Sequence, residues 1–454
     1  MEYTLFIFRR DLRLKDNNGL KYCIKNYDNI IPIFIFTPEQ ISHKNKYKSN
    51  NAIQFMIESL KELDSELKKN KSQLHLYHGK NISILKKIIK EINIKHIVFN
   101  MDYTPYAQKR DKKIKIFCKK NEITCDIIED YLLTNIGSIL KKDGKPYRVF
   151  TSFKNKGFTI KIDKPTKYII SKLKKVKLES KYPKHKINPD ILVRGGRKNG
   201  IKQLKKIKIQ KKYNDTRNNL DLETTLLSAY IKFGCLSIRE VYWKFVNSVG
   251  KNNGLVAQLF WREFYYYIVY YFPQVLKGKN FNTKYDNLAW NKNTKNYIKW
   301  CNGNTGYPVV DAGMRQMNKT GYMHNRARLI TANFMNRMLG LDWRLGEKYY
   351  AKMLTDYDPS VNNGNWQWIA STGVDPKPYF QRLFNPWLQS KKFDPDAKYI
   401  KTWLPQLKDI SANELHQWDN YYHNYDLHHI DYFKPIVNYK KARKESIEMY
   451  RKVL

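Results

Sequence analysis

The sequence predicts a two-part protein, in which an α/β domain with a parallel sheet precedes a large helical domain. Over residues 1–130, short apolar runs alternate with amphipathic segments, which is typical of βαβ units. From Thr224 onward, strand-like alternation is scarce, and Trp and Tyr recur at helical spacing. The 454 residues, 42% of them hydrophobic, are enough to build a core in each part.

Short apolar runs in the first part are the predicted strands. They are continuous rather than alternating, as expected for parallel strands that are buried on both faces. The runs cover residues 5–8, 30–36, 74–77, 96–99 and 125–128, and the helices predicted between them cover 19–25, 52–67, 82–92 and 106–119. A Gly-x-Gly-x-x-Gly motif does not follow the first run, so the dinucleotide fingerprint is absent. The first loop instead carries charges, from Arg9 and Arg10 to Arg13, with Asp16 and Asn17 after them.

The segment between the two parts is weakly patterned and rich in Lys, Gly and Pro. Its lysine runs, at 141–145 and 172–186, indicate a solvated surface. We therefore expect an α/β domain over 1–130, a connector lying over the surface at 131–210, and a helical domain over 211–454.

The charge balance points to a polyanionic partner. Lys and Arg number 84 against 41 acidic residues, which gives a net charge of +43. This excess favours a nucleic acid first and an anionic membrane surface second. An alternative source of part of the charge is compositional drift, because Lys, Asn, Ile and Tyr are abundant throughout, as AT-rich coding would produce.

Cysteine usage and the N-terminus point to an intracellular protein. The 5 cysteines are scattered and never form a Cys-x-x-Cys pair, so they predict no disulfide framework, zinc site or iron–sulfur cluster. The N-terminal apolar run is short and is followed by arginines, unlike a signal peptide. The longest apolar run, 265–272, is too short to span a bilayer. We expect a monomer in the cytoplasm or nucleus that neither binds a membrane nor contains a metal site.

The segment 356–368 concentrates residues that carry chemistry. Asp356 and Asp358 precede adjacent amides that begin at Asn362, and Trp366 and Trp368 follow. On a helix, successive residues turn by about 100°, so the two tryptophans point to different sides of one wall. Such a wall suits a buried aromatic cofactor. A core helix with two packing tryptophans is the simpler alternative.

Small hydroxyls before a helical run form a second cluster. Thr224, Thr225 and Ser228 can present N–H groups and hydroxyls to a phosphate, or can merely cap the helix. Farther along, Gln258 and Trp261 lie three residues apart on one helical face. An amide beside a π-face suits recognition of a base edge, although core packing of the tryptophan is equally compatible.

A third cluster contains two arginines, Arg326 and Arg328. Because they lie two residues apart, they face different ways on a helix. One can pair with a carboxylate such as Asp356 while the other meets a phosphate. A pair of surface arginines is the alternative.

With these motifs the chain resembles the photolyase/cryptochrome family over nearly its whole length. The His-Asn-Arg motif followed by Asn-Asn-Gly-x-Trp-Gln-Trp is most similar to the class I enzymes that repair cyclobutane pyrimidine dimers. The stretches that carry the resemblance are Phe-Arg-Arg-Asp-Leu-Arg-Leu at 8–14, Trp-Arg-Glu-Phe at 261–264, Thr-Gly-Tyr-Pro-Val-Val-Asp-Ala-Gly-Met at 305–314, Met-His-Asn-Arg at 323–326, Asp-Trp-Arg at 342–344, Asn-Asn-Gly-Asn-Trp-Gln-Trp-Ile-Ala-Ser-Thr-Gly at 362–373 and Lys-Phe-Asp-Pro at 392–395.

The resemblance implies a Rossmann-like antenna domain and a helical domain that binds FAD. It implies that Asn362 lies against the reactive nitrogen of the flavin ring, and that a surface-directed electron relay is formed by Trp300, Trp343 and Trp366. The remaining residues it implies at FAD are Tyr213, Arg217, Thr224, Thr225, Leu226, Ser228, Arg328, Asp356 and Asp358. The loop at 101–111 resembles that of members with a folate or deazaflavin antenna, and the choice between these pigments stays open.

The implied activity is that of a deoxyribodipyrimidine photo-lyase acting on UV-damaged DNA. A basic face binds the duplex, and the dimer is flipped into a cavity over the flavin. Light-excited reduced FAD then donates the electron that splits the cyclobutane ring. Trp261 and Trp368 would wall the cavity by stacking, Gln258 and Asn325 would line it, and Arg326 would hold the lesion phosphate.

Gln258 departs from the pattern of the dimer-repair enzymes, which usually carry Glu there. An amide donates a hydrogen bond at any pH, whereas a carboxyl must be protonated to do so. Gln is more typical of (6-4) photolyases and animal cryptochromes, but (6-4) enzymes carry a His pair where this chain has Asn325 and Leu329. We therefore expect repair of cyclobutane dimers. The alternatives are a cryptochrome-type blue-light photoreceptor without repair activity and, less favoured, a (6-4) photolyase.

Overall fold

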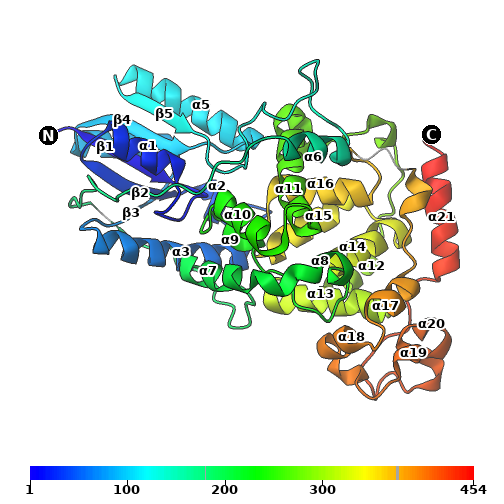
Figure 1. The fold of residues 1–454 in the computed structure, drawn as a ribbon. Helices are drawn as coiled ribbons and strands as arrows, with labels where there is room; N and C mark the ends of the chain where they lie inside the picture. The colour runs from blue at the N-terminus through cyan, green and yellow to red at the C-terminus, as the bar shows by residue number, and fades with distance from the viewer. Residues whose placement is uncertain (179, 375–377) are drawn as a thin grey trace.

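The computed structural model describes residues 1–178, 180–374 and 378–454. An α/β part that contains the N-terminus lies beside a larger helical part that contains the C-terminus (Figure 1). Parallel strands form one sheet in the order β3-β2-β1-β4-β5. They are β1 (Tyr3–Phe8), β2 (Ile30–Phe36), β3 (His75–His78), β4 (Ile94–Asn100) and β5 (Thr124–Ile128). The predicted fold class and each predicted strand are confirmed.

Helices cover both faces of this sheet, which explains the continuous apolar runs. Along β1, Phe6 and Phe8 enter one hydrophobic cluster, while Leu5 and Ile7 enter another on the opposite face. Figure 1 shows α5 above the sheet and α3 below it. The helices of this part are α1 (Asn18–Asn26), α2 (Pro38–Ile41), α3 (Asn50–Lys69), α4 (Asn81–Glu91) and α5 (Pro105–Lys120).

The segment predicted as a connector contains two helices, α6 (Phe150–Phe158) and α7 (Arg197–Lys205). Helix α6 packs closely on the helical part, because an added Cβ at Gly157 would lie 2.6 Å from a ring atom of Phe260. The segment is therefore partly built into the core, whereas the lysine patterning predicted only a surface path. The domain boundaries at 130 and 210 remain predictions.

The helical part is built around α11 (Gly254–Tyr271) and α16 (Pro359–Ile369), which pack against each other. A Cβ at Gly364 would lie 2.1 Å from the Tyr265 ring, so this crossing requires a glycine. Figure 1 shows α18–α20 at one corner of the molecule and α21 at its C-terminal edge. The other helices include α9 (Ser228–Lys232), α10 (Ile238–Val249), α12 (Thr294–Asn302), α13 (Pro308–Thr320), α14 (Asn325–Asn333), α15 (Trp343–Met353), α17 (Pro386–Phe393), α18 (Lys398–Trp403), α19 (Ala412–Leu415), α20 (Trp418–Tyr421) and α21 (Tyr439–Arg451).

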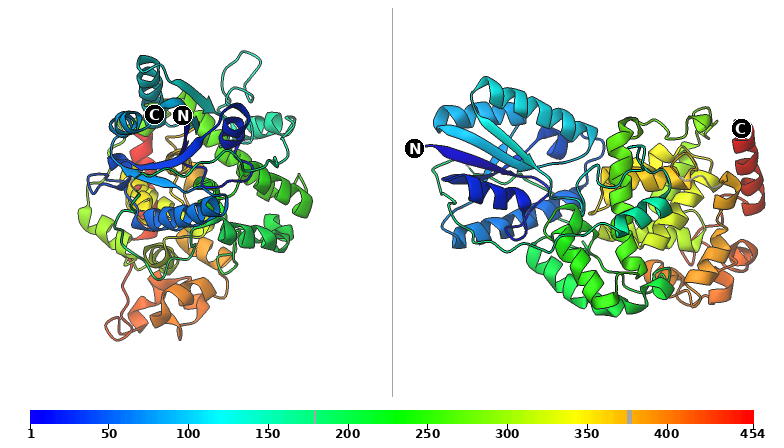
Figure 2. Two further views of the ribbon diagram at one scale, coloured as in Figure 1. Left: turned by 90° about the vertical axis from the view of Figure 1, so that its left-hand side faces the viewer. Right: turned by 45° about the horizontal axis from the view of Figure 1, so that its top comes forward.

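Buried charges in the first loop join the two parts. Arg13 forms an ion pair with Asp130 at 2.5 Å, and Arg239 from α10 reaches both Asp130 at 2.8 Å and Asp16 at 3.1 Å. One hydrophobic cluster also runs from the sheet into α11. The carboxyl ends of the strands face the helical part, as the right-hand view of Figure 2 shows. In open parallel sheets, this edge is where ligands bind.

Candidate active site

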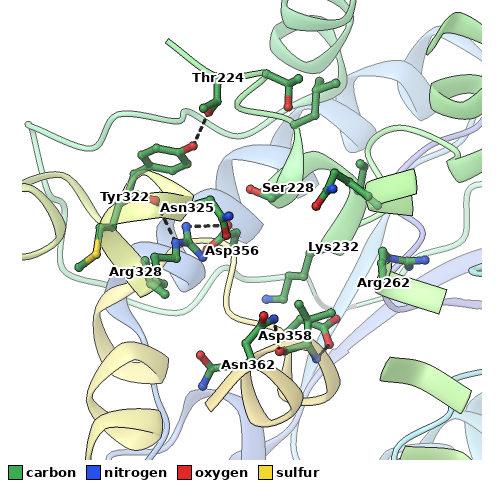
Figure 3. A pocket seen from close by; sticks show the side chains of 18 of the residues that line it. Thr224, Ser228, Lys232, Arg262, Tyr322, Asn325, Arg328, Asp356, Asp358 and Asn362 are labelled. Carbon is green, nitrogen blue, oxygen red and sulfur yellow. Dashed lines mark hydrogen bonds and ion pairs between the residues drawn. The ribbon is translucent and has the colours of Figure 1, made fainter. Parts of the chain in front are cut away.

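A cavity of about 300 Å³ opens in the helical part. Its wall comes from the loop before α9, from α11 and α14, and from the loop that leads into α16 (Figure 3). Segments far apart in the sequence therefore meet here. Of the residues singled out from the sequence, those that line it are Tyr213, Arg217, Thr224, Thr225, Leu226, Ser228, Gln258, Asn325, Arg328, Asp356, Asp358, Asn362 and Trp366.

One end of the cavity presents hydroxyl groups. The chain turns at Leu226, whose φ of 51° is left-handed, and this places Thr224 and Thr225 on the wall before α9 begins at Ser228. The Thr224 hydroxyl lies 2.6 Å from the hydroxyl of Tyr322. Such a row of hydroxyls is suited to the oxygens of a phosphate.

The opposite end presents carboxylates. Arg328 donates from its guanidinium to Oδ2 of Asp356 at 3.0 Å, which is the ion pair expected from the sequence. Oδ1 of Asp356 is buried and has no hydrogen-bond partner within the described residues. A buried acceptor of this kind is costly unless a ligand supplies a donor.

Asp358 is held in place by the α/β part. Its Oδ2 accepts hydrogen bonds from the Arg10 guanidinium and the Tyr266 hydroxyl, while its Oδ1 caps α16 by accepting from the N–H of Ser360 at 3.0 Å. Burial by itself would raise the pKa of Asp358, but Arg10 and these hydrogen bonds bring that pKa below its usual value. The carboxylate is therefore a fixed negative charge at the base of the cavity.

Asn362 is oriented by a second buried acid. Its amide nitrogen donates to the Glu347 backbone oxygen at 3.0 Å and to the Glu347 carboxyl at 3.3 Å. These bonds turn the amide nitrogen to Glu347 and leave the amide oxygen for the cavity that Asn362 lines. Burial raises the pKa of Glu347 to about 7, against the opposing effect of its hydrogen bonds with Asn362 and Tyr47. Asn362 thus offers the cavity an acceptor without a charge.

Gln258, Asn325 and Leu329 line the same cavity, and none of the described residues around it is a histidine. His324 lies just outside, where its Nδ1 accepts the Arg326 N–H at 3.1 Å and caps α14. Burial and the nearby arginines lower the pKa of His324 to about 4, so this imidazole is neutral at pH 7. Proton donors among the lining residues are therefore amides, hydroxyls and permanent cations rather than imidazoles.

Trp261 and Trp368 do not line this cavity. The Trp261 ring stacks on Phe150 of α6, with centroids 3.6 Å apart and an interplanar angle of 9°. The Trp368 ring lies under the Arg382 guanidinium at 4.5 Å. One face of each ring is already covered, so stacking on a lesion would use the other face or an edge. Their roles at a lesion remain predictions.

Arg326 points away from Asp356, as its spacing from Arg328 predicted. Its guanidinium donates to Oδ1 of Asn218 at 2.7 Å and lies over the Phe393 ring at 4.3 Å. Burial, with a smaller effect of Arg217, lowers the pKa of Arg326 to about 10, so it stays cationic. A half-buried cation beside the cavity fits the predicted phosphate contact, which remains a prediction.

The three predicted relay tryptophans are all in the core. Trp300 is 0% exposed, Trp343 1% and Trp366 2%, so these three alone do not lead to the surface. Trp300 and Trp366 do touch, with centroids 6.3 Å apart. Trp290 is half-buried, and a bridge between Asn291 and Leu341 sets its segment beside that of Trp343. The relay, with Trp300 or Trp290 at its outer end, remains a prediction. Trp290 was not singled out from the sequence, and its partial exposure distinguishes it from the fully buried Trp300.

A second cavity, of about 660 Å³, lies between the carboxyl edge of the sheet and the helical part. Asp102, Thr104 and Tyr106 line it, and they belong to the loop at 101–111 that the sequence linked to an antenna. Lys232 and Tyr357 line both cavities. The loop into α16 therefore forms part of the wall between them.

Several functional candidates were missed from the sequence. Lys232, Arg262 and Tyr322 line the first cavity, although the sequence assigned none of them a role. Arg262 lies within the Trp-Arg-Glu-Phe stretch, and the other two lie outside the matching stretches. Lys232 had a detectable pattern, because it lies four residues after Ser228 and so on the same helical face. The stacking of Phe150 on Trp261 had no detectable sequence pattern, because the two residues belong to distant segments.

Comparisons with known proteins agree with this geometry. The family model for the FAD binding domain of DNA photolyase matches residues 255–452, and the model for DNA photolyase matches residues 4–167. A deoxyribodipyrimidine photo-lyase of Buchnera aphidicola subsp. Baizongia pistaciae is 34% identical over 99% of this chain and 98% of its own. The chain belongs to the DNA photolyase family.

Solved structures extend this family likeness to the fold. An archaeal photolyase from Sulfolobus tokodaii, described with two FAD molecules, is 38% identical and covers 100% of both chains with a TM-score of 0.88. A Synechocystis cryptochrome is 25% identical over 99% of both chains, also with a TM-score of 0.88. The α/β part and the helical part are thus the two parts of a photolyase fold.

The residues of the first cavity fit FAD, the cofactor of this family. Thr224, Thr225 and Ser228 supply hydroxyls for the phosphates at one end. At the other end, the unpartnered Oδ1 of Asp356 and the amide oxygen of Asn362 supply acceptors for the N–H groups of a flavin ring. The polar groups at the two ends of the cavity therefore match the two ends of the cofactor.

Proposed function

We propose that this chain is a light-driven lyase that repairs cyclobutane pyrimidine dimers in DNA. One observation carries the choice of lesion: Asn325 and Leu329, and no histidine, line the described wall of the cavity. A (6-4) enzyme requires a histidine pair at those positions for its acid–base step. Splitting a cyclobutane ring requires an electron and hydrogen-bond donors, and the cavity offers both amide and hydroxyl donors.

Bound FAD, reduced and excited by blue light, supplies the electron that opens the ring and takes it back afterwards. The residues of this chain position that chemistry. The hydroxyl end fixes the phosphates, and the uncharged amide of Asn362 faces the ring without opposing its reduction. Gln258, on the wall of the same cavity, would donate to a pyrimidine carbonyl and stabilise the negative charge that develops there.

The DNA partner is supported by charge and by the family. The net charge of +43 favours a polyanion, bound with little sequence preference and with strong salt dependence. Arg326 would hold the lesion phosphate, and Trp261 and Trp368 would contact the flipped bases. We also propose that the chain acts as a monomer in the cytoplasm or nucleus. No helix in the described parts of the chain is both long and apolar enough to cross a bilayer.

We further propose that the second cavity binds an antenna pigment. Aromatic and cationic side chains line it, among them Tyr106, Arg9 and Arg110. Folate, deazaflavin and a second flavin share a flat aromatic ring that these side chains can hold. The Sulfolobus relative, which is described with two FAD molecules, favours the flavin.

The test uses protein purified in the dark, reduced, and mixed with oligonucleotides that carry one cyclobutane dimer or one (6-4) product. Blue light should restore the thymines of the first substrate only, as followed by chromatography against a dark control. Gln258→Leu keeps the size of the side chain but removes its donor, so repair should fall at least tenfold. Gln274→Leu, at an exposed glutamine outside both cavities, is the matched control and should repair normally.

The main alternative is a blue-light photoreceptor, favoured by the likeness to the Synechocystis cryptochrome. Photoreducible FAD with no repair of either lesion would refute the lyase and support the photoreceptor. Repair of the (6-4) product would instead refute the argument from Asn325 and Leu329.

A further inference from the structure

The side chain of Lys232 has no role in the mechanism proposed above. It ends α9, one helical turn after Ser228, and it lines the first cavity. Its ammonium nitrogen lies 3.4 Å from the centroid of the Phe233 ring and forms no ion pair with any described residue. Its backbone oxygen is occupied, because it accepts from Arg10 and Tyr131. The backbone is therefore anchored while the cation itself is left for a ligand.

The ammonium points to the carboxylate end of the cavity. Figure 3 shows it directed toward Asp358 and Asn362 and away from Thr224. The hydroxyl end, which suits phosphates, is thus not the end that Lys232 serves. In the FAD site proposed above, Asn362 is the uncharged residue that faces the flavin ring. Lys232 therefore lies at the ring end of the proposed cofactor site.

The nearby carboxylates are already paired with other cations. Asp356 is paired with Arg328, and Asp358 with Arg10. Burial and the charge of Arg10 lower the pKa of Lys232 to about 7, although Asp358, Asp356 and Asp102 act in the other direction. When Lys232 is protonated, this end of the cavity holds one more cation than its carboxylates neutralise. A ligand with a negative charge would stabilise that protonated form.

We propose that Lys232 is the counter-charge for the negative charge that a flavin ring acquires on reduction, and that it raises the reduction potential of the bound cofactor. Taking up two electrons and one proton leaves one net negative charge on the ring. A cation within a few ångströms in a partly desolvated site favours that product over the neutral oxidised ring. The proposal rests on the FAD site proposed above but not on DNA repair.

The test is the midpoint potential of the holoprotein, measured by dye equilibration at pH 7. Lys232→Met removes the charge and keeps the length of the side chain. At one ambient potential, the ratio of reduced to oxidised flavin should fall about tenfold, equivalent to about 30 mV for a two-electron couple. Lys232→Arg keeps the charge and should stay within about threefold of the wild type.

The matched control is Lys295→Met. Lys295 is an exposed cation on α12 that lines neither cavity, so its removal should leave the potential unchanged. Should Lys232→Met fail to fold, Lys232→Gln gives the same comparison with a polar side chain. FAD content is measured for every variant by absorbance against protein concentration.

Two results would overturn the proposal. One is an unchanged potential in Lys232→Met. The other is loss of FAD with an unchanged potential in the protein that retains it, which would make Lys232 an anchor for the phosphates. The repair assay, run on fully reduced protein, is separate. A lowered potential together with failed repair by the wild type would support Lys232 as the counter-charge and refute the repair function.

Discussion

Replacing Asp358 tests how the α/β part holds the cofactor site. Asp358 is 7% exposed and has two functions, since its Oδ1 caps α16 and its Oδ2 accepts from Arg10 and Tyr266. In Asp358→Asn, the amide oxygen can keep the cap, but the amide NH₂ faces the donors of Arg10 and Tyr266. Asp358→Ala removes both functions. Comparing the two variants therefore separates the charge from the cap.

The magnitudes follow from the partners that remain. Removing one member of a buried ion pair costs about 3–5 kcal/mol, because the other charge is left uncompensated. Arg10 keeps a contact with Asp102 at 3.5 Å and with the Tyr131 hydroxyl at 2.5 Å. We therefore expect the low end, about 3 kcal/mol, for Asp358→Asn. Losing the cap adds about 1 kcal/mol, so Asp358→Ala should cost about 4 kcal/mol.

The assay is urea denaturation at pH 7, followed by far-UV circular dichroism and by the fluorescence of released flavin. A cost below about 1 kcal/mol for the Asn variant would refute the argument for the ion pair. Equal costs for Asn and Ala would refute the argument for the cap. The pKa of Asp358 is depressed on folding, from about 3.9 in the unfolded chain. The contribution of the pair is therefore present above about pH 4 and is lost as the pH falls below it, where the Asn variant should approach the wild type.

Three further predictions concern the neighbouring helices. In Gly346→Ala, the added Cβ would lie 2.1 Å from a ring atom of Trp366, so overpacking should cost about 1–3 kcal/mol in a thermal melt, and an unchanged melting temperature would contradict the close packing. Burial raises the pKa of Glu347 to about 7, so stability should fall as the pH rises from about 4 to 7. The stability of Glu347→Gln should not fall over this pH range. If the melting temperatures of the variant and the wild type depended equally on pH from 5 to 8, the raised pKa of Glu347 would be disproved. Trp290→Phe should slow photoreduction of FAD by an external reductant more than Trp300→Phe does, and the opposite ranking would restore Trp300 as the outer relay residue.

The strands of the sheet could be predicted because the signal for each one lies in a short, continuous stretch of sequence. A strand buried on both faces must be apolar at nearly every position, and β2 (Ile30–Phe36) is buried throughout. The strand order could not be predicted, since pairing of β1 with both β2 and β4 depends on how distant helices cover the two faces. The helices at 150–158 and 197–205 were missed, because the lysines around them match a solvated surface. Helix α6 gains its stability from packing on α11, which sequence periodicity does not record.

The site residues could be predicted where one motif supplies neighbouring groups. They could not be predicted where the role of a side chain depends on its burial in the fold. The hydroxyls at Thr224 and Thr225 and the carboxylates at Asp356 and Asp358 reached one cavity as expected. Trp300 lies in α12 and Trp290 in the segment before it, and only the fold shows that Trp300 has no exposed surface. Lys232 carries no motif. It stands out only in the fold, where it lines the cavity and forms no ion pair with the residues that the structure describes.

The wall between the two cavities links the two halves of the protein. Arg10 lines the second cavity, Asp358 lines the first, and the two residues form an ion pair. Asp358 also caps α16, the helix that carries Asn362. A ligand that drew Arg10 away from Asp358 would weaken the cap of α16. It would also raise the pKa of Lys232, since Arg10 is the charge that lowers that pKa most. Binding of a ligand in the second cavity should therefore change the reduction potential of the flavin, even where no side chain of the first cavity moves.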